Sequence, residues 1–385
     1  MTANSKISLK ICLVAHFAYG AMNGGSTGHI GGVERQTSLL ARWLASRGHQ
    51  VSLITWDEGQ PDSAEIDGVR TLKLCKEMEG IPGIRFIYPR WTSLNKALRR
   101  ADADVYYQNC GEYVTGQVAL WCRFKSRRFV YSVAANADCE PDLPLMTKFR
   151  ERILYRYGLR HADRVIVQTQ AQHQMLVQNF DCAPVVIPMP CQGPTDLAVI
   201  PSDPPDPERS GILWVGRVCE VKRPDRFLEL ARSCPDLNFQ LVGPEDGSEY
   251  SRRVIVRAKE IPNVSVSGPA TYEQLSQFYR QALCLCSTSD FEGFPNTYLE
   301  AWSFGLPVIT TYDPDDVIVR KKLGAVASDV PGLARSIRDL LASPDLWKSV
   351  SVNARQYYVE NHSIEKVLPR FEQVFREALN NGIKK

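Results

Sequence analysis

Short apolar runs alternate along the chain with stretches in which apolar residues recur every three or four positions. Apolar runs bounded by turn residues are typical of buried parallel strands, and the second pattern is typical of helices that cover a sheet. The predicted strands lie near 7–15, 49–55, 69–74, 104–108, 129–134, 164–169, 185–188, 212–215, 239–242, 264–267 and 283–286. The predicted helices lie near 33–46, 94–100, 114–124, 145–159, 171–179, 225–232, 249–259, 272–281, 334–341 and 366–380. This alternation predicts an α/β protein with doubly wound parallel sheets.

A proline cluster interrupts the pattern near the middle of the chain. Its members are Pro190, Pro194, Pro201, Pro204, Pro205 and Pro207. Such clusters are typical of linkers between domains. Because 385 residues exceed one typical domain, we expect two α/β domains that meet near residue 190.

The stretch from Ser289 to Ala301 follows an apolar strand and carries two carboxylates, Glu292 and Glu300. Gly293 and Pro295 predict a turn, and a helix is expected to start at Asn296 or Thr297. Helix N-termini bind anions, and carboxylates accept hydrogen bonds from hydroxyl groups. A diphosphate with a sugar on each side, as in a nucleotide sugar, would suit this pattern. Alternatively, Glu300 is the capping-box partner of Thr297 and Glu292 is a solvated loop residue.

Two cations follow the first strand of the second half. Gly216-Arg217 comes directly after 212–215, and Lys222 lies five residues beyond Arg217. Side chains at the carboxyl end of a strand reach the ligand-binding edge of such sheets, where arginine and lysine can bind a diphosphate. The alternative is a pair of ordinary surface charges.

Taken together, these segments resemble the family 4 glycosyltransferases. Glu292-x7-Glu300 followed by Gly305-x-Pro307 is similar to the E-x7-E segment of that family, and Gly216-Arg217-x4-Lys222 is similar to its G-R-x4-K element. Gly31-Gly32 resembles its first glycine-rich loop, and 263–268 resembles a segment whose backbone contacts the nucleobase. The resemblance implies the GT-B architecture, in which two doubly wound Rossmann-like domains face each other across a cleft. It implies an acceptor-side domain over 1–190, a nucleotide-sugar domain over 191–365 and a helix at 366–385 that crosses back to the first domain.

The resemblance also implies a role for each site residue. Arg217 and Lys222 would hold the diphosphate, Glu292 would orient the transferred sugar, and Glu300 would bind the ribose. The donor-binding residues implied are Gly31, Gly32, Arg217, Lys222, Gly268, Glu292, Gly293, Phe294, Pro295, Asn296, Thr297 and Glu300. The implied activity is retaining transfer of a hexosyl unit from a nucleotide sugar to a hydroxyl of a glycan or lipid-linked glycan. The leaving phosphate itself would take the acceptor proton, and no metal or other cofactor is expected.

The chain departs from the family pattern after the strand near 129–134. Many relatives carry a histidine there, whereas this chain has Ala134-Ala135-Asn136-Ala137-Asp138. Asn136 or Asp138 would then bind an acceptor hydroxyl, although either residue could equally cap a helix or form a turn. Two other functions therefore stay open: a GT-B nucleotide-sugar epimerase and a catalytically silent nucleotide-sugar-binding protein.

The cysteines and the aspartate pairs give no sign of a metal site. The 11 cysteines are scattered without a C-x-x-C pair, which indicates free thiols in a reducing compartment. Asp102-x-Asp104 precedes a strand, so neither this pair nor Asp313-x-Asp315 is expected to bind metal. The apolar run near residues 7–19 contains Lys10 and is interpreted as the first strand, not a signal peptide. These features predict a cytoplasmic protein.

Charge is distributed unevenly between the two halves. Residues 1–190 hold 23 Lys and Arg against 17 Asp and Glu, whereas the remainder holds 23 against 26. The basic residues concentrate at 123–128 and 148–160. They are either solvated helix faces or a surface attracted to an anionic membrane or a lipid-diphosphate acceptor. Nucleic acid is not expected, because the charge is modest and no binding module is visible.

Overall fold

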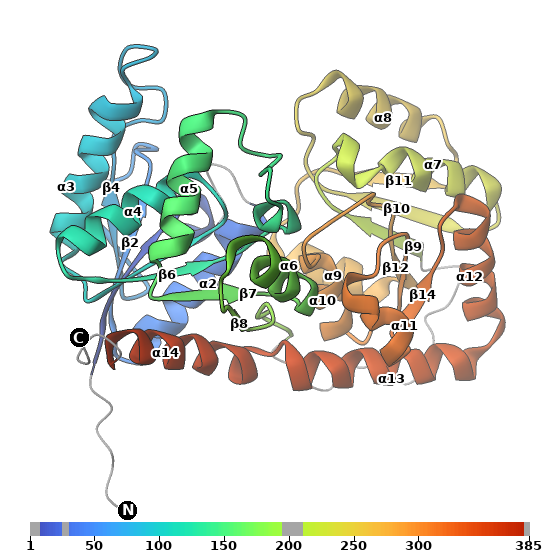
Figure 1. Cartoon of the computed structure of the whole chain (residues 1–385). Helices are drawn as coiled ribbons and strands as arrows, with labels where there is room; N and C mark the ends of the chain where they lie inside the picture. Colours follow the sequence, from blue (N-terminus) through green and yellow to red (C-terminus); the bar gives the residue numbers. More distant parts are fainter. Residues whose placement is uncertain (1–7, 25–30, 195–210, 381–385) are drawn as a thin grey trace, which may run out of the picture. The chain divides into compact units, whose positions relative to one another are not determined.

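The computed structural model describes residues 8–24, 31–194 and 211–380 of the chain. The chain divides into two compact units, which are considered separately (Figure 1). Unit 1 comprises Met1–Met189 together with Val367–Lys385, and unit 2 comprises Pro190–Lys366. Both are Rossmann-like α/β units, which agrees with the predicted fold class.

Among the described residues of unit 1, eight strands form one sheet in the order β3-β4-β2-β1-β5-β6-β7-β8. They are β1 (Lys10–Val14), β2 (Gln50–Thr55), β3 (Glu65–Ile66), β4 (Val69–Lys73), β5 (Val105–Asn109), β6 (Arg128–Ser132), β7 (Arg164–Val167) and β8 (Val185–Val186). Ile11 of β1 lies opposite both Val51 and Val105. All strand pairs are parallel except the edge pair β3–β4.

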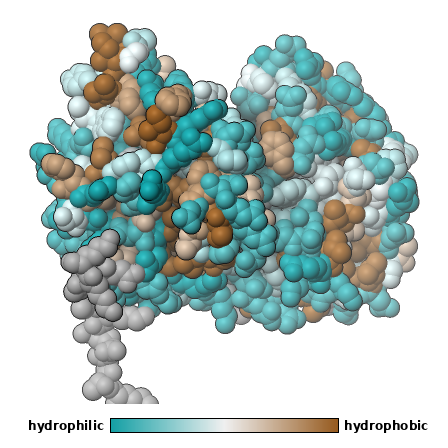
Figure 2. Space-filling view, in the orientation of Figure 1, coloured by the Kyte–Doolittle hydropathy of each residue, from teal (hydrophilic) through white to brown (hydrophobic). Residues whose placement is uncertain are grey.

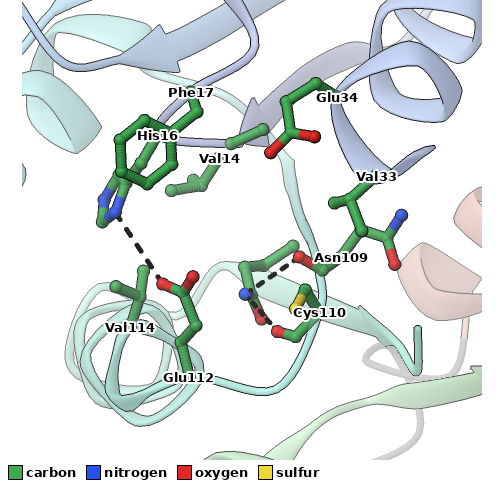
Figure 3. Close-up of a pocket in the computed structure, with 11 residues that line it drawn as sticks. Val14, His16, Phe17, Val33, Glu34, Asn109, Cys110, Glu112 and Val114 are labelled. Atoms are coloured by element: carbon green, nitrogen blue, oxygen red, sulfur yellow. Dashed lines mark hydrogen bonds and ion pairs between the residues drawn. The ribbon is translucent and has the colours of Figure 1, made fainter. Parts of the chain in front are cut away.

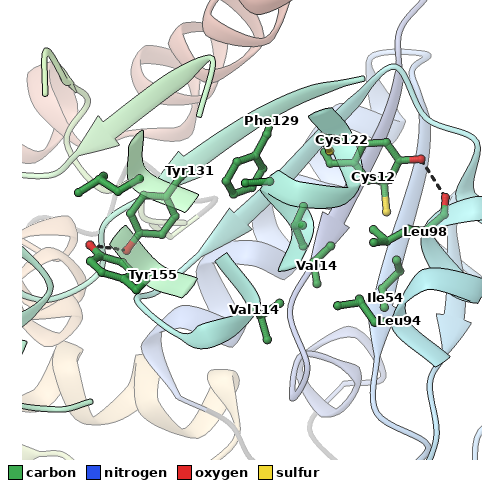
Figure 4. Packing of buried hydrophobic residues seen from close by; sticks show 14 of the residues in the cluster. Cys12, Val14, Ile54, Leu94, Leu98, Val114, Cys122, Phe129, Tyr131 and Tyr155 are labelled. Carbon is green, nitrogen blue, oxygen red and sulfur yellow. Dashed lines mark hydrogen bonds between the residues drawn. The ribbon is translucent and has the colours of Figure 1, made fainter. Parts of the chain in front are cut away.

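Helices cover both faces of this sheet. They are α1 (Tyr19–Met22), α2 (Gly32–Ser46), α3 (Thr92–Ala101), α4 (Tyr113–Phe124), α5 (Phe149–His161), α6 (Gln170–Phe180) and most of α14 (Ile364–Asn380). Because side chains alternate along a strand, Cys12 and Val14 share one face, where they join residues of α3, α4, α5 and α6 in a buried cluster (Figure 4). On the other face, Tyr107 of β5 meets Phe371 and Phe375 of α14 edge-on.

Unit 2 is built around a second sheet, with the order β11-β10-β9-β12-β13-β14 among its described residues. The strands are β9 (Gly211–Val215), β10 (Asn238–Val242), β11 (Val264–Ser267), β12 (Cys284–Ser287), β13 (Val308–Thr310) and β14 (Gly324–Val326). The helices are α7 (Pro224–Ser233), α8 (Glu249–Lys259), α9 (Tyr272–Gln281), α10 (Asn296–Ser303), α11 (Val317–Lys321), α12 (Val330–Ala342) and α13 (Pro344–Asn361). All pairs in this sheet are parallel.

Strand order reverses at one point in each sheet. In unit 1 the chain moves outward from β1 through β2 and β4, and then returns to place β5 on the other side of β1. In unit 2 it moves from β9 through β10 to β11, and then returns to place β12 beside β9. In open α/β sheets, ligands bind beyond the carboxyl ends of the strands at such a switch point. Ligand-binding sites are therefore expected at the carboxyl ends of the β1/β5 and β9/β12 strand pairs.

One predicted helix needs correction, and one long helix was missed. The helix expected from Leu145 begins only at Phe149, because residues 143–148 are not helical and contain a turn. Helix α13 was not predicted at all, although Ser343 caps it by accepting a hydrogen bond from the Leu346 N–H, and Pro344 occupies its first turn.

The cysteines are free thiols, and seven of them are buried. All eleven cysteines, each within the described ranges, are free, and Cys284 and Cys286 lie in the buried core of unit 2. In the part of the chain that the structure describes, we find no helix with the length and apolar character needed to cross a membrane.

Candidate active site

Two loops leave neighbouring strands at the switch point of unit 2. Arg217 and Lys222 lie in the loop after β9, and Glu292 lies in the loop after β12. Since β9 and β12 pair in parallel, both loops emerge from the same edge of the sheet. The structure therefore gathers these three predicted residues at one edge, where a ligand of such a sheet is expected.

The ammonium group of Lys222 binds the carboxylate of Glu292 directly. The Ser289 hydroxyl donates a second hydrogen bond to the same carboxylate at 2.8 Å, and the Tyr312 hydroxyl donates to the backbone carbonyl of Glu292 at 2.9 Å. The side chains of Lys222 and Glu292 are 30% and 15% exposed. The pair is thus partly shielded from water but open to a ligand, which makes its electrostatic interactions stronger than those of a surface pair.

Thr288, at the start of the loop after β12, connects this loop to the loop after β9. Its hydroxyl lies 2.9 Å from the carbonyl of Lys222 and 2.8 Å from that of Arg223, and accepts a hydrogen bond from Trp214 at 3.1 Å. Asp290 continues the connection by pairing with Arg226 at 2.7 Å. These contacts hold the backbone of Lys222 in a fixed place relative to the Glu292 loop.

The backbone before Arg217 packs closely against the end of the neighbouring strand β10. The Gly216 N–H donates to the Val242 carbonyl at 3.0 Å, and Gly243 then turns with a φ of +144°. A Cβ on Gly243 would lie 1.8 Å from the Gly216 carbonyl oxygen, so only glycine fits there. The Gly243 N–H reaches the carbonyls of Ser267 and Gly268, which places Gly268 at the same edge, after β11.

Helix α10 begins at this edge and carries Glu300 one turn inside. Pro295 is its N-cap and makes no side-chain cap, so the capping box expected between Thr297 and Glu300 does not form. Glu300 instead accepts a hydrogen bond from the Tyr279 hydroxyl of α9 at 2.7 Å. Its carboxylate is therefore oriented by a buried tyrosine, and the local capping alternative is wrong.

The other residues predicted to bind the donor lie in the loop before α10 and in its first turn. Gly293 accepts from the Tyr312 hydroxyl at 3.4 Å, and Phe294 packs against Trp302 and His362. Pro295, Asn296 and Thr297 follow directly and place the start of the helix beside Glu292.

In unit 1, the predicted glycine loop is described only at its end. Gly31 is the N-cap of α2, and its N–H donates to the Glu34 carboxylate at 2.9 Å. Gly32 is the first residue of the helix. Residues 25–30, which precede these glycines, lie outside the described residues.

The predicted acceptor residues Asn136 and Asp138 have partners inside unit 1. Asn136 accepts from the Gln172 side chain at 3.1 Å. Asp138 is 2% exposed, and its carboxylate accepts from the backbone N–H groups of Gly111, Ala134 and Ala135 at 3.1–3.4 Å. Asp138 thus ties the segment after β5 to the segment after β6.

Both aspartate pairs also have partners. Arg127 binds Asp102 at 2.7 Å and Asp104 at 3.1 Å. Asp313 accepts from the backbone N–H groups of Ile318 and Val319.

Several residues at the two switch points were not found from the sequence. Tyr279, Tyr312 and Thr288 orient the predicted carboxylates and loops in unit 2, and Glu112 lies at the switch point of unit 1. Glu112 could have been predicted as a site residue, because it follows a predicted strand closely. Tyr279 and Tyr312 could not, because each is distant in sequence from the glutamate that it contacts.

Two family models match the chain, and together they cover most of it. The glycosyl transferase 4-like domain matches residues 31–190, and the glycosyl transferases group 1 domain matches residues 200–357.

Curated relatives match over part of their length. An uncharacterized glycosyltransferase of Haemophilus influenzae is 25% identical over 176 residues, 43% of this chain and 49% of the relative. A D-inositol 3-phosphate glycosyltransferase of Mycobacterium sp. (strain JLS) is 26% identical over 193 residues, 47% of this chain and 43% of the relative. The chain therefore matches about half the length of these relatives, or slightly less.

Solved structures match over nearly the whole chain. Sucrose-phosphate synthase from Thermosynechococcus elongatus has a TM-score of 0.77 at 19% identity and covers 96% of this chain and 99% of its own. Anabaena HepE, solved with UDP-glucose, has a TM-score of 0.72 at 14% identity and covers 96% and 100%. At these identities the likeness establishes the fold.

Proposed function

Because the chain belongs to the family 4 glycosyltransferases of the GT-B superfamily, we propose that it is a retaining hexosyltransferase. Its donor is a nucleoside diphosphate sugar, and its acceptor is a hydroxyl of a glycan or lipid-linked glycan. The observation that carries this proposal is the Lys222–Glu292 pair at the β9/β12 switch point, beside the first turn of α10. The structural neighbour HepE was solved with UDP-glucose, which supports a donor of this class.

Each residue of the site has one role in this proposal. Lys222 and Arg217 neutralise the diphosphate, together with the amides of Phe294–Thr297 at the start of α10. Glu292 accepts from hydroxyls of the transferred sugar while Ser289 and Lys222 fix its orientation. The donor phosphate that leaves takes the acceptor proton. The largest catalytic contribution is then stabilisation of charge that develops on the diphosphate, which the two cations supply without a metal ion.

Replacing Glu300 by glutamine is expected to weaken donor binding with little change in kcat. A carboxylate that accepts from two ribose hydroxyls contributes about 1.5–3 kcal/mol, so the donor KM should rise roughly 10- to 100-fold. Steady-state kinetics with varied donor measure this. The control is Glu249→Gln, a carboxylate whose side chain is 78% exposed in the same unit. Equal kinetics for the two variants would remove Glu300 from the donor site.

A thermal-shift panel of UDP-, GDP- and ADP-sugars tests the function as a whole. A ligand that binds only the native state raises the melting temperature of the protein. At a ligand concentration a hundredfold above Kd, the free energy of unfolding rises by about 2.7 kcal/mol. The donor so identified is then incubated with and without glycan acceptors. Transfer supports the proposal, isomerisation of the donor alone indicates an epimerase, and binding without either reaction indicates a silent binding protein.

We further propose that unit 1 contacts an anionic membrane surface. Met78, Ile81, Ile84, Ile87 and Tyr88 are each 58–69% exposed within one short segment before α3, where Figure 2 shows apolar surface. The neighbouring helix α5 is basic, with Arg150, Arg152, Arg156 and Arg160 against Glu151, and Arg150 lies 4.4 Å over the Phe86 ring. Apolar side chains beside basic ones are the pattern expected for binding at an anionic lipid interface.

Vesicle sedimentation tests this contact with the full-length protein. The protein should bind phosphatidylserine-containing vesicles more than phosphatidylcholine vesicles, and added salt should weaken the binding. The double variant Ile84→Asp/Ile87→Asp should lower the partition coefficient at least tenfold, because each buried isoleucine contributes about 1.5–3 kcal/mol. Val319→Asp, at a 61% exposed apolar residue of unit 2, is the control. Absence of binding, or equal loss in both variants, would contradict the contact.

A further inference from the structure

A small cavity lies at the switch point of unit 1. It forms between the carboxyl ends of β1 and β5 and the first turns of α2 and α4, and has a volume of about 70 Å³ (Figure 3). A cavity of this size accommodates a few small polar groups. Its position is the one where ligands of open α/β sheets bind, and the donor-site residues described above are all in unit 2 apart from Gly31 and Gly32.

The polar groups around this cavity are mostly hydrogen-bond acceptors. Glu34 enters it from α2 and Glu112 from the start of α4, and the described residues that line it include no lysine or arginine. The His16 Nδ1 lies 3.9 Å from the Glu112 carboxylate. Because Glu112 caps α4 through its backbone N–H and not through its side chain, its carboxylate is available to a ligand. The cavity thus favours ligands that donate hydrogen bonds and disfavours anions.

Two buried polar atoms of the cavity lining provide an independent observation. Among the described residues, neither the Nε2 of His16 nor the Oδ1 of Asn109 has a hydrogen-bond partner, although both residues are only 8% exposed. An unsatisfied buried polar atom costs about 1–3 kcal/mol. Such atoms are rare in native proteins unless a ligand or water satisfies them. Because His16 and Asn109 both line this cavity, the cavity is a place where a ligand could satisfy such atoms.

We propose that this cavity is an acceptor subsite that binds hydroxyl groups of a neutral sugar or polyol through Glu112, Glu34, His16 and Asn109. This inference rests on the proposed transferase function and narrows its acceptor. Hydroxyl groups donate to the carboxylates and to Asn109, and each can also pair with His16. A phosphate or carboxylate at the same position would face two carboxylates, and no lysine or arginine is among the described residues that line the cavity, so acidic sugars are disfavoured at this subsite.

Surrounding charges make the subsite sensitive to pH. Burial, and then the charges of Glu34, Asp138 and Glu151, raise the pKa of Glu112 to about 7, while its side chain remains 39% exposed. Burial, and then the Arg90 charge, lower the pKa of His16 to about 3, so this histidine is neutral. Tyr113 is adjacent, and burial raises the pKa of its hydroxyl. Glu112 therefore changes charge near pH 7, and its ionised form accepts from hydroxyls most strongly.

Calorimetric titration of the full-length protein tests the proposal. The probes are methyl α-glucoside, methyl α-galactoside and myo-inositol, each compared with an acidic counterpart: glucuronate, galacturonate and inositol phosphate. At least one neutral probe should bind at least tenfold more tightly than its counterpart, and more tightly at pH 8 than at pH 6. Glu112→Gln should lower that affinity about tenfold and remove the pH dependence. Asn109→Ala should lower it and keep the pH dependence.

The matched control is Glu65→Gln, an exposed carboxylate on the edge strand β3 of the same unit. Its affinity and pH dependence should equal those of the unchanged protein, and melting temperatures check that every variant folds. Tighter binding of acidic probes, absence of binding by any probe, or equal behaviour of Glu112→Gln and Glu65→Gln would overturn the subsite. Failure of the transferase function would be seen separately, as absence of transfer from any nucleotide sugar while neutral probes still bind unit 1.

Discussion

Replacing Lys222 with alanine is expected to lower kcat/KM for sugar transfer at least about a thousandfold, which corresponds to roughly 4 kcal/mol of transition-state stabilisation. The ammonium group of Lys222 binds Glu292 in a partly shielded site. In the proposed function this group stabilises the charge that develops on the diphosphate. Glu292→Ala should have a comparable effect, because in the same proposal its carboxylate faces the transferred sugar. Initial rates of nucleotide release with saturating acceptor measure both variants.

The control for this pair is the surface ion pair Arg253–Glu249, whose side chains are 62% and 78% exposed. Arg253→Ala should leave kcat/KM unchanged. Calorimetry should show Lys222→Ala and Glu292→Ala folded, because Thr288 and Tyr312 hold their loops through backbone carbonyls. If both variants keep the turnover of the unchanged protein, the site assignment is wrong.

The double variant Lys222→Ala/Glu292→Ala separates two explanations of such losses. If each residue contacts the donor independently, the two losses in free energy should add. If Lys222 acts only by orienting Glu292, the double variant should be no slower than the Glu292 variant alone.

Local sequence patterns predicted most strands and the segments that carry the site. A buried parallel strand needs only a short apolar run with a polar end, and the run before Arg217 forms β9 as expected. Helices α8 and α9 have the predicted ends, because Ser248 and Thr271 cap them by accepting from N–H groups three residues later. Capping is a local interaction, so its signal is complete within a few residues.

Contacts between distant segments could not be predicted in this way. Thr297-x-x-Glu300 matches a local capping pattern, yet the Glu300 carboxylate accepts a hydrogen bond from Tyr279 of another helix. The cavity of unit 1 depends on the pairing of β1 with β5, which brings His16 and Glu112 together across 96 positions of sequence. The strand order that creates this pairing follows from the packing of the whole unit, and no short pattern encodes it.

Asp138 shows how the same limit affects a predicted functional residue, and replacing it with alanine should test its role. The variant Asp138→Ala leaves the partly buried N–H groups of Gly111, Ala134 and Ala135 without their carboxylate acceptor. An unsatisfied buried group costs about 1–3 kcal/mol, and partial burial places these three in the lower part of that range, so the free energy of unfolding should fall by about 3–5 kcal/mol. For a unit of this size the melting temperature should fall by roughly 6–15 °C, which differential scanning calorimetry measures.

Two further variants separate a structural role of Asp138 from acceptor binding. Asp138→Asn keeps one acceptor oxygen in place and should lose less stability than Asp138→Ala, whereas Asp142→Ala removes an exposed carboxylate four residues away and should lose almost none. A residue that only binds acceptor would give the opposite pattern, with an unchanged melting temperature and a raised acceptor KM. An unchanged melting temperature in Asp138→Ala would therefore favour a role of Asp138 in acceptor binding, because three partly buried N–H groups cannot lose their shared carboxylate without a cost in stability.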